Sequence, residues 1–328
     1  MAKFKKIKSW IPLPSLLPLR TFPSRVPLKW KYIFTTLQKL VFLKLGRIGA
    51  RVIGTNQVGN TLLRLNRDYP VGKKGFVIEL PRDEVIFNQL KYTGSWEREI
   101  SEFLASGLKK ISLRNDPKAA MIDIGANCGF ISLQTMNISQ TPDDYFLIEP
   151  LPRHVHALRN NLEKMSKSKK INIFEFALSD KNGCSEIYTE RLNQGNSTIL
   201  PNVVQSYDNS VTNIRLLDTK SFCDDYLSEF SDYVIKSDTQ GMDALILSRI
   251  PIKIWKNVES AVIEVWALPE VLESDVHNLL AMWKEFDCIS WSSNSTETGG
   301  GLLHLEDVRK FWLSKSRVER NLFLSKSN

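Results

Sequence analysis

The chain has 328 residues, a formal net charge of +8, and 42% hydrophobic and 24% charged residues, which is typical of a soluble protein with one large or two ordinary domains. Its four cysteines show no CxxC spacing, which argues against a disulfide framework or a zinc site and favours a reducing compartment. No apolar stretch reaches the roughly 20 residues of a transmembrane helix. The reducing compartment indicated by the cysteines predicts a cytoplasmic protein.

The charge is divided unevenly along the chain. Residues 1–75 contain 16 Lys and Arg and a single acid, whereas the remainder contains 28 Lys and Arg and 35 acids. Residues 1–30 are rich in Pro and Lys, which predicts an extended arm. Between Lys31 and Val52, apolar residues recur at helical spacing among basic ones, which predicts a basic amphipathic helix. We therefore take residues 1–75 as a basic N-terminal extension.

Such an extension on an acidic body suits an anionic surface, and a nucleic-acid partner is not expected, because the rest of the chain is acidic. The apolar face of the helix has two interpretations: it packs on the main domain, or it lies on a membrane surface. The second interpretation predicts contact with an anionic membrane through residues 1–55 and a peripheral location at that membrane.

After the extension, strands and helices alternate. A strand is predicted at Phe76–Leu80, and a helix from Ser95, its expected N-cap, to Lys110. Further strands are predicted at 119–124, 144–149, 171–178, 183–189, 213–218, 232–238, 259–265, 288–292 and 320–326. Further helices are predicted at 128–137, 151–165, 219–230 (capped by Asp218), 242–250, 269–286 and 306–315. Apolar strands that alternate with helices predict an α/β domain over residues 76–328, with a parallel sheet covered on both faces.

Five of the predicted strands carry a carboxylate at or near their ends: Asp123, Glu149, Asp180, Asp238 and Glu264. The carboxyl ends of the strands in a doubly wound sheet form one edge, where ligands bind. Carboxylates that meet there repel one another. We therefore expect a positively charged guest, either a metal ion or a cationic organic ligand, in place of a pyrophosphate.

The stretch from Asp123 to Gly129 follows the pattern DxGxNxG, which differs from the GxGxxG of phosphate-binding loops. S-adenosylmethionine carries a sulfonium and an ammonium and no phosphate. We expect Asp123, Gly125, Asn127 and Gly129 to surround its methionine end, with the glycines permitting close backbone approach. Glu149 stands at the end of the next strand, where a carboxylate accepts ribose hydroxyls. The base is expected to lie near Ala177, Leu178 and Asp180.

These segments together resemble the FkbM family of S-adenosylmethionine-dependent methyltransferases. The resemblance covers Trp96 to the C-terminus and rests on IDIGANCGFISL, FLIEPLPRHVHALRNNL, FALSDKNG, GNSTIL, IRLLDTKSF, DYVIKSDTQGMDALIL and AVIEV, in that order. It implies a class I methyltransferase (Rossmann-like) fold: a mostly parallel seven-stranded sheet with an antiparallel last strand and helices on both faces, in which 288–292 and 320–326 form the terminal pair. It also implies O-methylation of a hydroxyl on a sugar, glycan or other hydroxylated metabolite.

An alcohol is a weak nucleophile, so a base must accept its proton as it attacks the methyl group. Asp238 is the first candidate for this base or for a ligand of a divalent metal, and Glu264 is the second; the alternative is that Asp238 caps the following helix. Asp243 stands where the family has its hydrophobic–acid pair, and is expected to orient a neighbour. The residues expected to bind the acceptor are Asn196, Ser197 and Gln240.

Two other functions stay open. An NAD-dependent oxidoreductase would also use Glu149, but the DxGxNxG loop disfavours it. A non-catalytic protein of the same fold, which binds a membrane or nucleic acid through its basic N-terminus, is disfavoured by the nearly complete motifs. Cys128 is expected to be a packing residue, and His154 and His156 to be partly exposed helix positions. Lys236 either neutralises the acids or points to the other face of the sheet.

Overall fold

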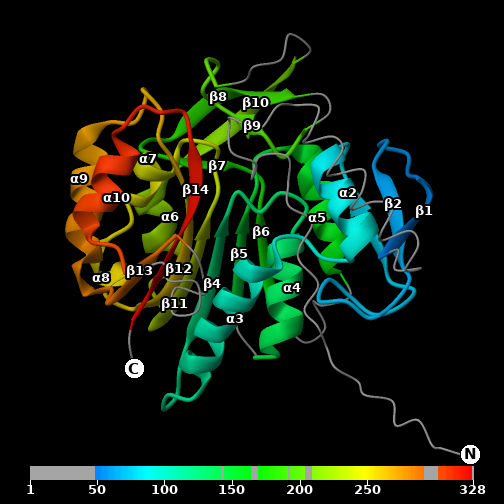
Figure 1. Ribbon diagram of the computed structural model, residues 1–328, viewed down its shortest axis with the longest axis horizontal. Coiled ribbons are helices and arrows are strands. Elements are labelled where there is room, and N and C mark those ends of the chain that lie inside the picture. The colour runs from blue at the N-terminus through cyan, green and yellow to red at the C-terminus, as the bar shows by residue number, and fades with distance from the viewer. Residues whose placement is uncertain are drawn as a thin grey trace, which may run out of the picture.

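The computed structural model describes residues 49–141, 144–163, 169–190, 193–203, 209–291 and 302–326. A seven-stranded sheet with the order β13-β14-β12-β11-β4-β5-β6 forms its centre (Figure 1). The neighbouring strands pair in parallel, except that β14 is antiparallel to both β12 and β13. The bounds of these strands are β4 Ala119–Ile124, β5 Asp144–Ile148, β6 Lys170–Phe174, β11 Asp232–Ser237, β12 Val258–Trp266, β13 Cys288–Ser290 and β14 Glu319–Ser325.

Helices cover both faces of this sheet, and each face has its own core. Along β4, alternate side chains enter different cores: Ile122 packs in the first and Met121 in the second. This alternation explains why the strand is apolar at nearly every position. The first core is covered by α6 Thr219–Tyr226, α7 Asp243–Leu247, α8 Ile252–Trp255, α9 Glu273–Met282 with the 3-10 turn η2 Trp283–Glu285, and α10 Leu305–Trp312. The second is covered by α2 Glu84–Thr93, α3 Arg98–Ser112, α4 Phe130–Ser139 and α5 Pro152–Leu162.

Two smaller sheets flank the central one. The N-terminal sheet consists of β1 Ala50–Thr55, β2 Thr61–Leu65 and β3 Val77–Leu80 in antiparallel order, and it lies beside α2 and α5 (Figure 1). The second sheet has the order β7-β10-β8-β9 and is built from β7 Ala177–Ser179, β8 Gly183–Glu190, β9 Ser197–Thr198 and β10 Asn209–Asp218.

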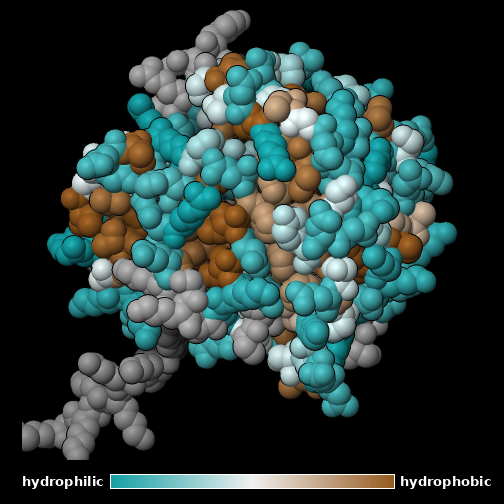
Figure 2. Space-filling model, turned by 180° about the vertical axis from the view of Figure 1, so that it is seen from behind, coloured by the Kyte–Doolittle hydropathy of each residue, from teal (hydrophilic) through white to brown (hydrophobic). Residues whose placement is uncertain are grey.

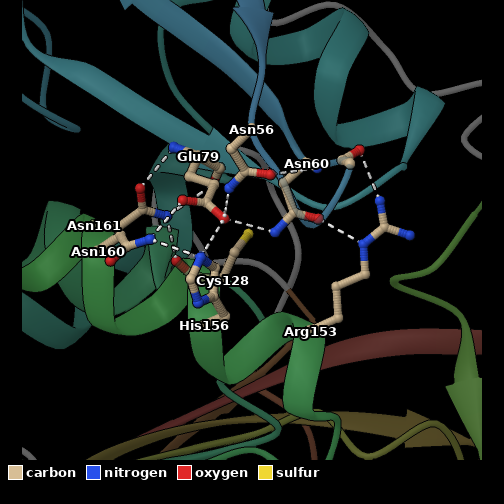
Figure 3. A network of polar contacts seen from close by, with 9 residues as sticks. Asn56, Asn60, Glu79, Cys128, Arg153, His156, Asn160 and Asn161 are labelled. Carbon is tan, nitrogen blue, oxygen red and sulfur yellow. Dashed lines mark hydrogen bonds and ion pairs between the residues drawn. The ribbon is translucent and has the colours of Figure 1, made fainter.

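A buried polar cluster attaches the N-terminal sheet to α5 (Figure 3). The carboxylate of Glu79 on β3 accepts hydrogen bonds of 2.7 Å from the amides of Asn56, Asn60 and Asn160. Asn161 on α5 pairs with the backbone of Glu79 through bonds of 2.7 and 2.9 Å, and also donates to the carbonyl of Cys128 at 2.8 Å. These hydrogen bonds attach the N-terminal sheet to α5 and to the loop that precedes α4.

The alternating architecture predicted from the sequence is confirmed, including the parallel sheet, the antiparallel last strand and the cap at Asp218, which accepts from the backbone of Ser221 at 2.7 Å. Ser95 as a helix N-cap is wrong. The unpredicted helix α2 ends at Gly94, whose φ is 72°, and the hydroxyl of Ser95 turns back to Thr93. The next helix therefore begins only at Arg98.

The predicted strand at 171–178 is in fact two strands in different sheets, β6 and β7, because β7 pairs with β10 instead of continuing along β5. The amphipathic helix predicted from Lys31 lies mostly outside the described residues, and its predicted end at Val52 belongs to β1. The N-terminal sheet extends across the predicted boundary between residues 75 and 76; the division into two units stays a prediction. No helix in the described ranges is both long and apolar enough to cross a bilayer.

Candidate active site

A cavity of about 450 Å³ lies at the carboxyl ends of β4, β5, β11 and β12. This is the edge where the fold predicts a ligand. The beginning of β14 also lines the cavity, because an antiparallel strand starts at the edge where its parallel neighbours end. Residues 193–199, which lead into and through β9, form another wall.

The loop after β4 bends around the end of β5. The backbone N–H groups of Gly125 and Ala126 both donate to the carbonyl of Ile148 at 3.0 Å. Gly125 has a φ of 74°, and a Cβ at this position would lie 2.0 Å from the carbonyl oxygen of Asp238. Asn127 also has a positive φ, of 52°. Gly125 and Asn127 both line the cavity, as expected of a loop that approaches a ligand closely.

Gly129 has a structural role at the start of α4. It does not line the cavity but begins α4 with a φ of 81°. A Cβ there would lie 2.4 Å from Cδ1 of Leu158 on α5. The absence of a side chain at Gly129 therefore lets α4 and α5 pack closely, and its predicted contact with the cofactor stays a prediction.

Asp123 lies beneath the cavity instead of lining it. Its side chain is fully buried, accepts from the hydroxyl of Ser132 at 2.6 Å, and lies 3.2 Å from Nζ of Lys236. Lys236 also donates to the carbonyl of Gly125 at 2.6 Å. Burial alone would lower the pKa of Lys236, but the carboxylates of Asp123 and Asp238 raise it above its usual value. Lys236 therefore neutralises the buried acid and fixes the loop, as one of its two interpretations predicted.

Glu149 follows β5 and is buried at the wall of the cavity. One oxygen accepts from the backbone of Asn127 at 2.8 Å, and the other from the backbone of Leu151 at 3.0 Å. His154 is buried as well, with Nδ1 3.5 Å from Glu149, so its predicted partial exposure is wrong. The backbone bonds hold the carboxylate of Glu149 at the end of the strand, next to the loop.

The opposite side of the cavity is formed by two carboxylates bridged by an amide. Nε2 of Gln240 donates to Asp238 at 2.7 Å and to Glu264 at 2.8 Å. Burial, followed by the nearby charge of Asp238, raises the pKa of Glu264 well above its usual value. Glu264 is therefore the carboxyl of the pair whose environment favours the protonated form, while the side chain of Asp238 is 35% exposed.

Asp243 supports this pair from behind. It is buried and accepts from the hydroxyl of Ser237 and, at 3.3 Å, from the backbone of Thr239. Burial raises the pKa of Asp243 to about 6. Because Ser237 and Thr239 flank Asp238, this arrangement orients the turn that presents Asp238, in agreement with the orienting role expected for Asp243.

The predicted ring of five acids is only partly formed. Glu149, Asp238 and Glu264 line the cavity, whereas Asp123 lies below it. Asp180 is exposed and does not line it, because the strand break moves this residue to the end of β7 in the second sheet. Its predicted place beside the base stays a prediction, while the neighbouring Ala177 and Leu178 do line the cavity.

The segment predicted to bind the acceptor reaches the cavity. Asn196 and Ser197 both line it. Asn196 donates to Glu190 at 3.1 Å, and the hydroxyl of Ser197 donates to the carbonyl of Gln194 at 2.7 Å. Thr198 donates to the backbone carbonyl of Gln240 at 2.8 Å, which connects this segment to the carboxylate pair.

Sequence reasoning missed several residues at the cavity wall. Asp83 caps α2 through a 2.8 Å bond from Ile86 and holds Gly195 at 2.8 Å, a link between residues 112 positions apart that no local pattern reveals. Further wall residues are Trp96, Glu97, Glu319 and Arg320. Glu319 and Arg320 could have been predicted from the sequence, because a terminal strand that is antiparallel to its neighbour begins at the edge where the parallel strands end.

The sequence analysis also raised the role of Cys128 and the possibility of a metal site. Cys128 is buried, and burial raises the pKa of its thiol well above the usual value, which confirms a packing residue. Within the described ranges, no group of three or more His, Cys, Asp or Glu side chains has the arrangement of a metal site.

The strand order and the single antiparallel strand define a class I methyltransferase fold.

No family model and no curated protein matches the chain. Similar solved structures include Aeropyrum pernix fibrillarin with bound S-adenosyl-L-methionine, at 10% identity over 84% of this chain and 99% of that one, with a TM-score of 0.34. A SAM-dependent methyltransferase from Agrobacterium tumefaciens is 8% identical over 86% and 78%, with a TM-score of 0.36. The bifunctional kinase-methyltransferase WbdD is 11% identical over 74% and 42%, with a TM-score of 0.37.

Proposed function

We propose that the protein is an S-adenosylmethionine-dependent O-methyltransferase whose acceptor is a hydroxyl of a sugar, a glycan or another hydroxylated metabolite. The observation that carries this proposal is the meeting, in one cavity, of the Gly125–Asn127 loop with Glu149 on one side and the Asp238–Gln240–Glu264 triad on the other.

The chemistry of the first side fits this cofactor. The loop offers backbone groups, and Glu149 offers a carboxylate to ribose hydroxyls. Lys236, which lines the cavity, is engaged with Asp123, Asp238 and the carbonyl of Gly125, so it is not free to neutralise a pyrophosphate. Arg320, the other basic residue of the wall, enters from β14. The acidic wall instead suits a ligand with a net positive charge. This favours S-adenosylmethionine over NAD.

The second side supplies the acid–base chemistry. S-adenosylmethionine would supply a methyl group on a sulfonium, and the transfer needs an aligned hydroxyl nucleophile. The Asp238 carboxylate accepts the hydroxyl proton as the oxygen attacks, which leaves a neutral Asp238, a methyl ether and a neutral thioether. Gln240 holds Asp238 in place, and Glu264 keeps its own proton, because two adjacent carboxylates do not both stay ionised. Asn196 and Ser197 contact the acceptor from the β9 segment.

The proposal is tested with purified enzyme, S-adenosylmethionine labelled in its methyl group, and a panel of acceptors. The panel pairs free sugars, glycosides and lipid-linked glycans with analogues in which each hydroxyl is replaced by hydrogen. We expect label in an ether that is absent from the matched deoxy compound, and loss of transfer in Asp238→Asn. Transfer to nitrogen or carbon would contradict O-methylation, and reduction of NAD with no methyl transfer would establish the oxidoreductase instead.

A further inference from the structure

Glu97 enters the cavity wall from the turn between α2 and α3. Hydrophilic residues cover most of the surface seen in Figure 2, where a charged side chain is in contact with water and needs no further partner. Glu97 differs from those residues, because it is half-buried and lines a cavity. A carboxylate in such a place is a candidate for contact with a ligand.

The backbone at Glu97 is strained. Glu97 stands directly before Arg98, the first residue of α3, with a φ of 38° and a ψ of 53°. Residues other than glycine adopt this left-handed conformation at an energetic cost, and such positions concentrate at ligand-binding sites. The side chain of Glu97 makes no capping hydrogen bond to α3, so helix capping does not explain the conformation.

Long-range hydrogen bonds hold this turn in place. The side chain of Gln134 on α4 is fully buried. Its Oε1 accepts from the backbone N–H of Trp96 at 2.9 Å, and its Nε2 donates to the carbonyl of Trp96 and, at 2.8 Å, to the hydroxyl of Ser101. Because α4 follows the loop that contains Gly125, Gln134 fixes the turn before α3 relative to that loop. The structure thus maintains Glu97 in the wall in spite of its backbone strain.

The charge of Glu97 acts at the same end of the cavity as this loop. Glu97 is one of the acids whose negative charge raises the pKa of Lys236, and Nζ of Lys236 donates to the carbonyl of Gly125 at 2.6 Å. Asp123, the acid that leads into the loop, lies beneath the cavity with Lys236 as its counter-charge. Glu97 therefore brings a negative charge to this end of the cavity wall, whereas Asp123 remains beneath it.

We propose that the carboxylate of Glu97 binds the α-ammonium of S-adenosylmethionine at this end of the cavity. The inference rests on the proposed function and extends it, since it names the residue that holds the amino-acid part of the cofactor. The ammonium offers three N–H donors to a carboxylate, and hydrogen bonds between ionised groups are the strong ones. The sulfonium has no N–H, and its methyl group must point toward the hydroxyl that Asp238 deprotonates. Glu97 binds the cofactor and takes no part in the proton transfer.

Calorimetric titration with three related ligands tests this role. S-adenosylmethionine has both the ammonium and the sulfonium, S-adenosylhomocysteine keeps the ammonium but lacks the sulfonium charge, and 5′-methylthioadenosine keeps the nucleoside and the sulfur but lacks the amino acid. Each ligand is titrated into the full-length protein and into Glu97→Gln, which removes the charge with little change in size. The matched control is Glu99→Gln, since Glu99 belongs to the first turn of the same helix but is exposed and does not line the cavity.

We expect Glu97→Gln to weaken the binding of S-adenosylmethionine and S-adenosylhomocysteine by the same factor, about 10- to 100-fold, and to leave the binding of 5′-methylthioadenosine unchanged. The control should bind all three ligands as the wild type does. Circular dichroism checks that each variant is folded.

Unchanged affinity for S-adenosylmethionine in Glu97→Gln would overturn the inference. So would a loss that 5′-methylthioadenosine shares, which would assign Glu97 to the shape of the wall, or a loss confined to S-adenosylmethionine, which would assign it to the sulfonium. In each of these cases the proposed function stands. Wild-type protein that binds none of the three ligands would overturn the proposed function, and the role of Glu97 with it.

Discussion

The ion pair between Lys236 and Asp123 gives the sharpest stability prediction. Both side chains are almost entirely inaccessible to water, and their charged atoms lie 3.2 Å apart beneath the cavity. In Lys236→Met, Asp123 would keep the hydroxyl of Ser132 as a hydrogen-bond donor but lose its counter-charge. An unpaired buried carboxylate is strongly disfavoured, so we expect the free energy of unfolding at pH 7 to fall by about 3–5 kcal/mol.

Urea unfolding followed by circular dichroism measures this loss, with Asp123→Asn and the double variant completing a thermodynamic cycle. Because the double variant removes both charges, it should be clearly more stable than the sum of the two single losses predicts. The pKa of Lys236 is raised in the folded state. Its stabilising contribution is therefore complete at neutral pH and is lost only as the solution becomes strongly alkaline. A loss below about 1 kcal/mol in Lys236→Met, a value typical of exposed pairs, or simple additivity in the cycle, would refute this reasoning.

Four further substitutions test the cavity. Asp238→Asn is expected to lower kcat by about 10²–10⁴ at saturating S-adenosylmethionine; a normal rate would exclude Asp238 as the base. Glu149→Ala should weaken that affinity about 10- to 100-fold, because it removes a charged hydrogen-bond acceptor, and unchanged affinity would remove Glu149 from the site. Gly125→Ala places a Cβ 2.0 Å from the carbonyl oxygen of Asp238, so scanning calorimetry should show a loss of about 1–3 kcal/mol or more; an unaltered transition would contradict the loop geometry. Burial raises the pKa of Asp243 to about 6, so the folded state holds a proton that the unfolded state has released. Asp243 should therefore make stability decrease by up to about 1.4 kcal/mol per pH unit as the pH rises from ~4 to ~6. Because the raised pKa of Glu264 adds a decrease of the same sign, Asp243→Asn should show a smaller decrease, and identical pH profiles would contradict the burial argument.

The sequence was most informative where one strand or one loop determines its own structure. The segments that form β4, β11 and β12 are short apolar runs with acids near their ends, and such runs predict buried parallel strands without knowledge of their neighbours. The DxGxNxG loop was likewise recognisable, because the positive φ angles at Gly125 and Asn127 suit the residues found there.

Sequence reasoning failed where a residue's role depends on a distant partner. From the sequence alone, Asp123 resembles a ligand-binding acid. In the structure, the register of β4 and β11 places it opposite Lys236, with which it forms an ion pair. The apolar run 171–178 contains no Gly or Pro to mark its break; the break follows from the pairing of β7 with β10, which begins about 30 residues later. For that reason Asp180 lies outside the cavity wall.

Isothermal titration calorimetry of the full-length protein tests most directly whether the cavity holds a cationic ligand without phosphate. We predict one S-adenosylmethionine bound per chain, with binding weakened in Glu149→Ala, and no heat of binding with NAD. Saturable binding of NAD at this site, with none of S-adenosylmethionine, would contradict the account.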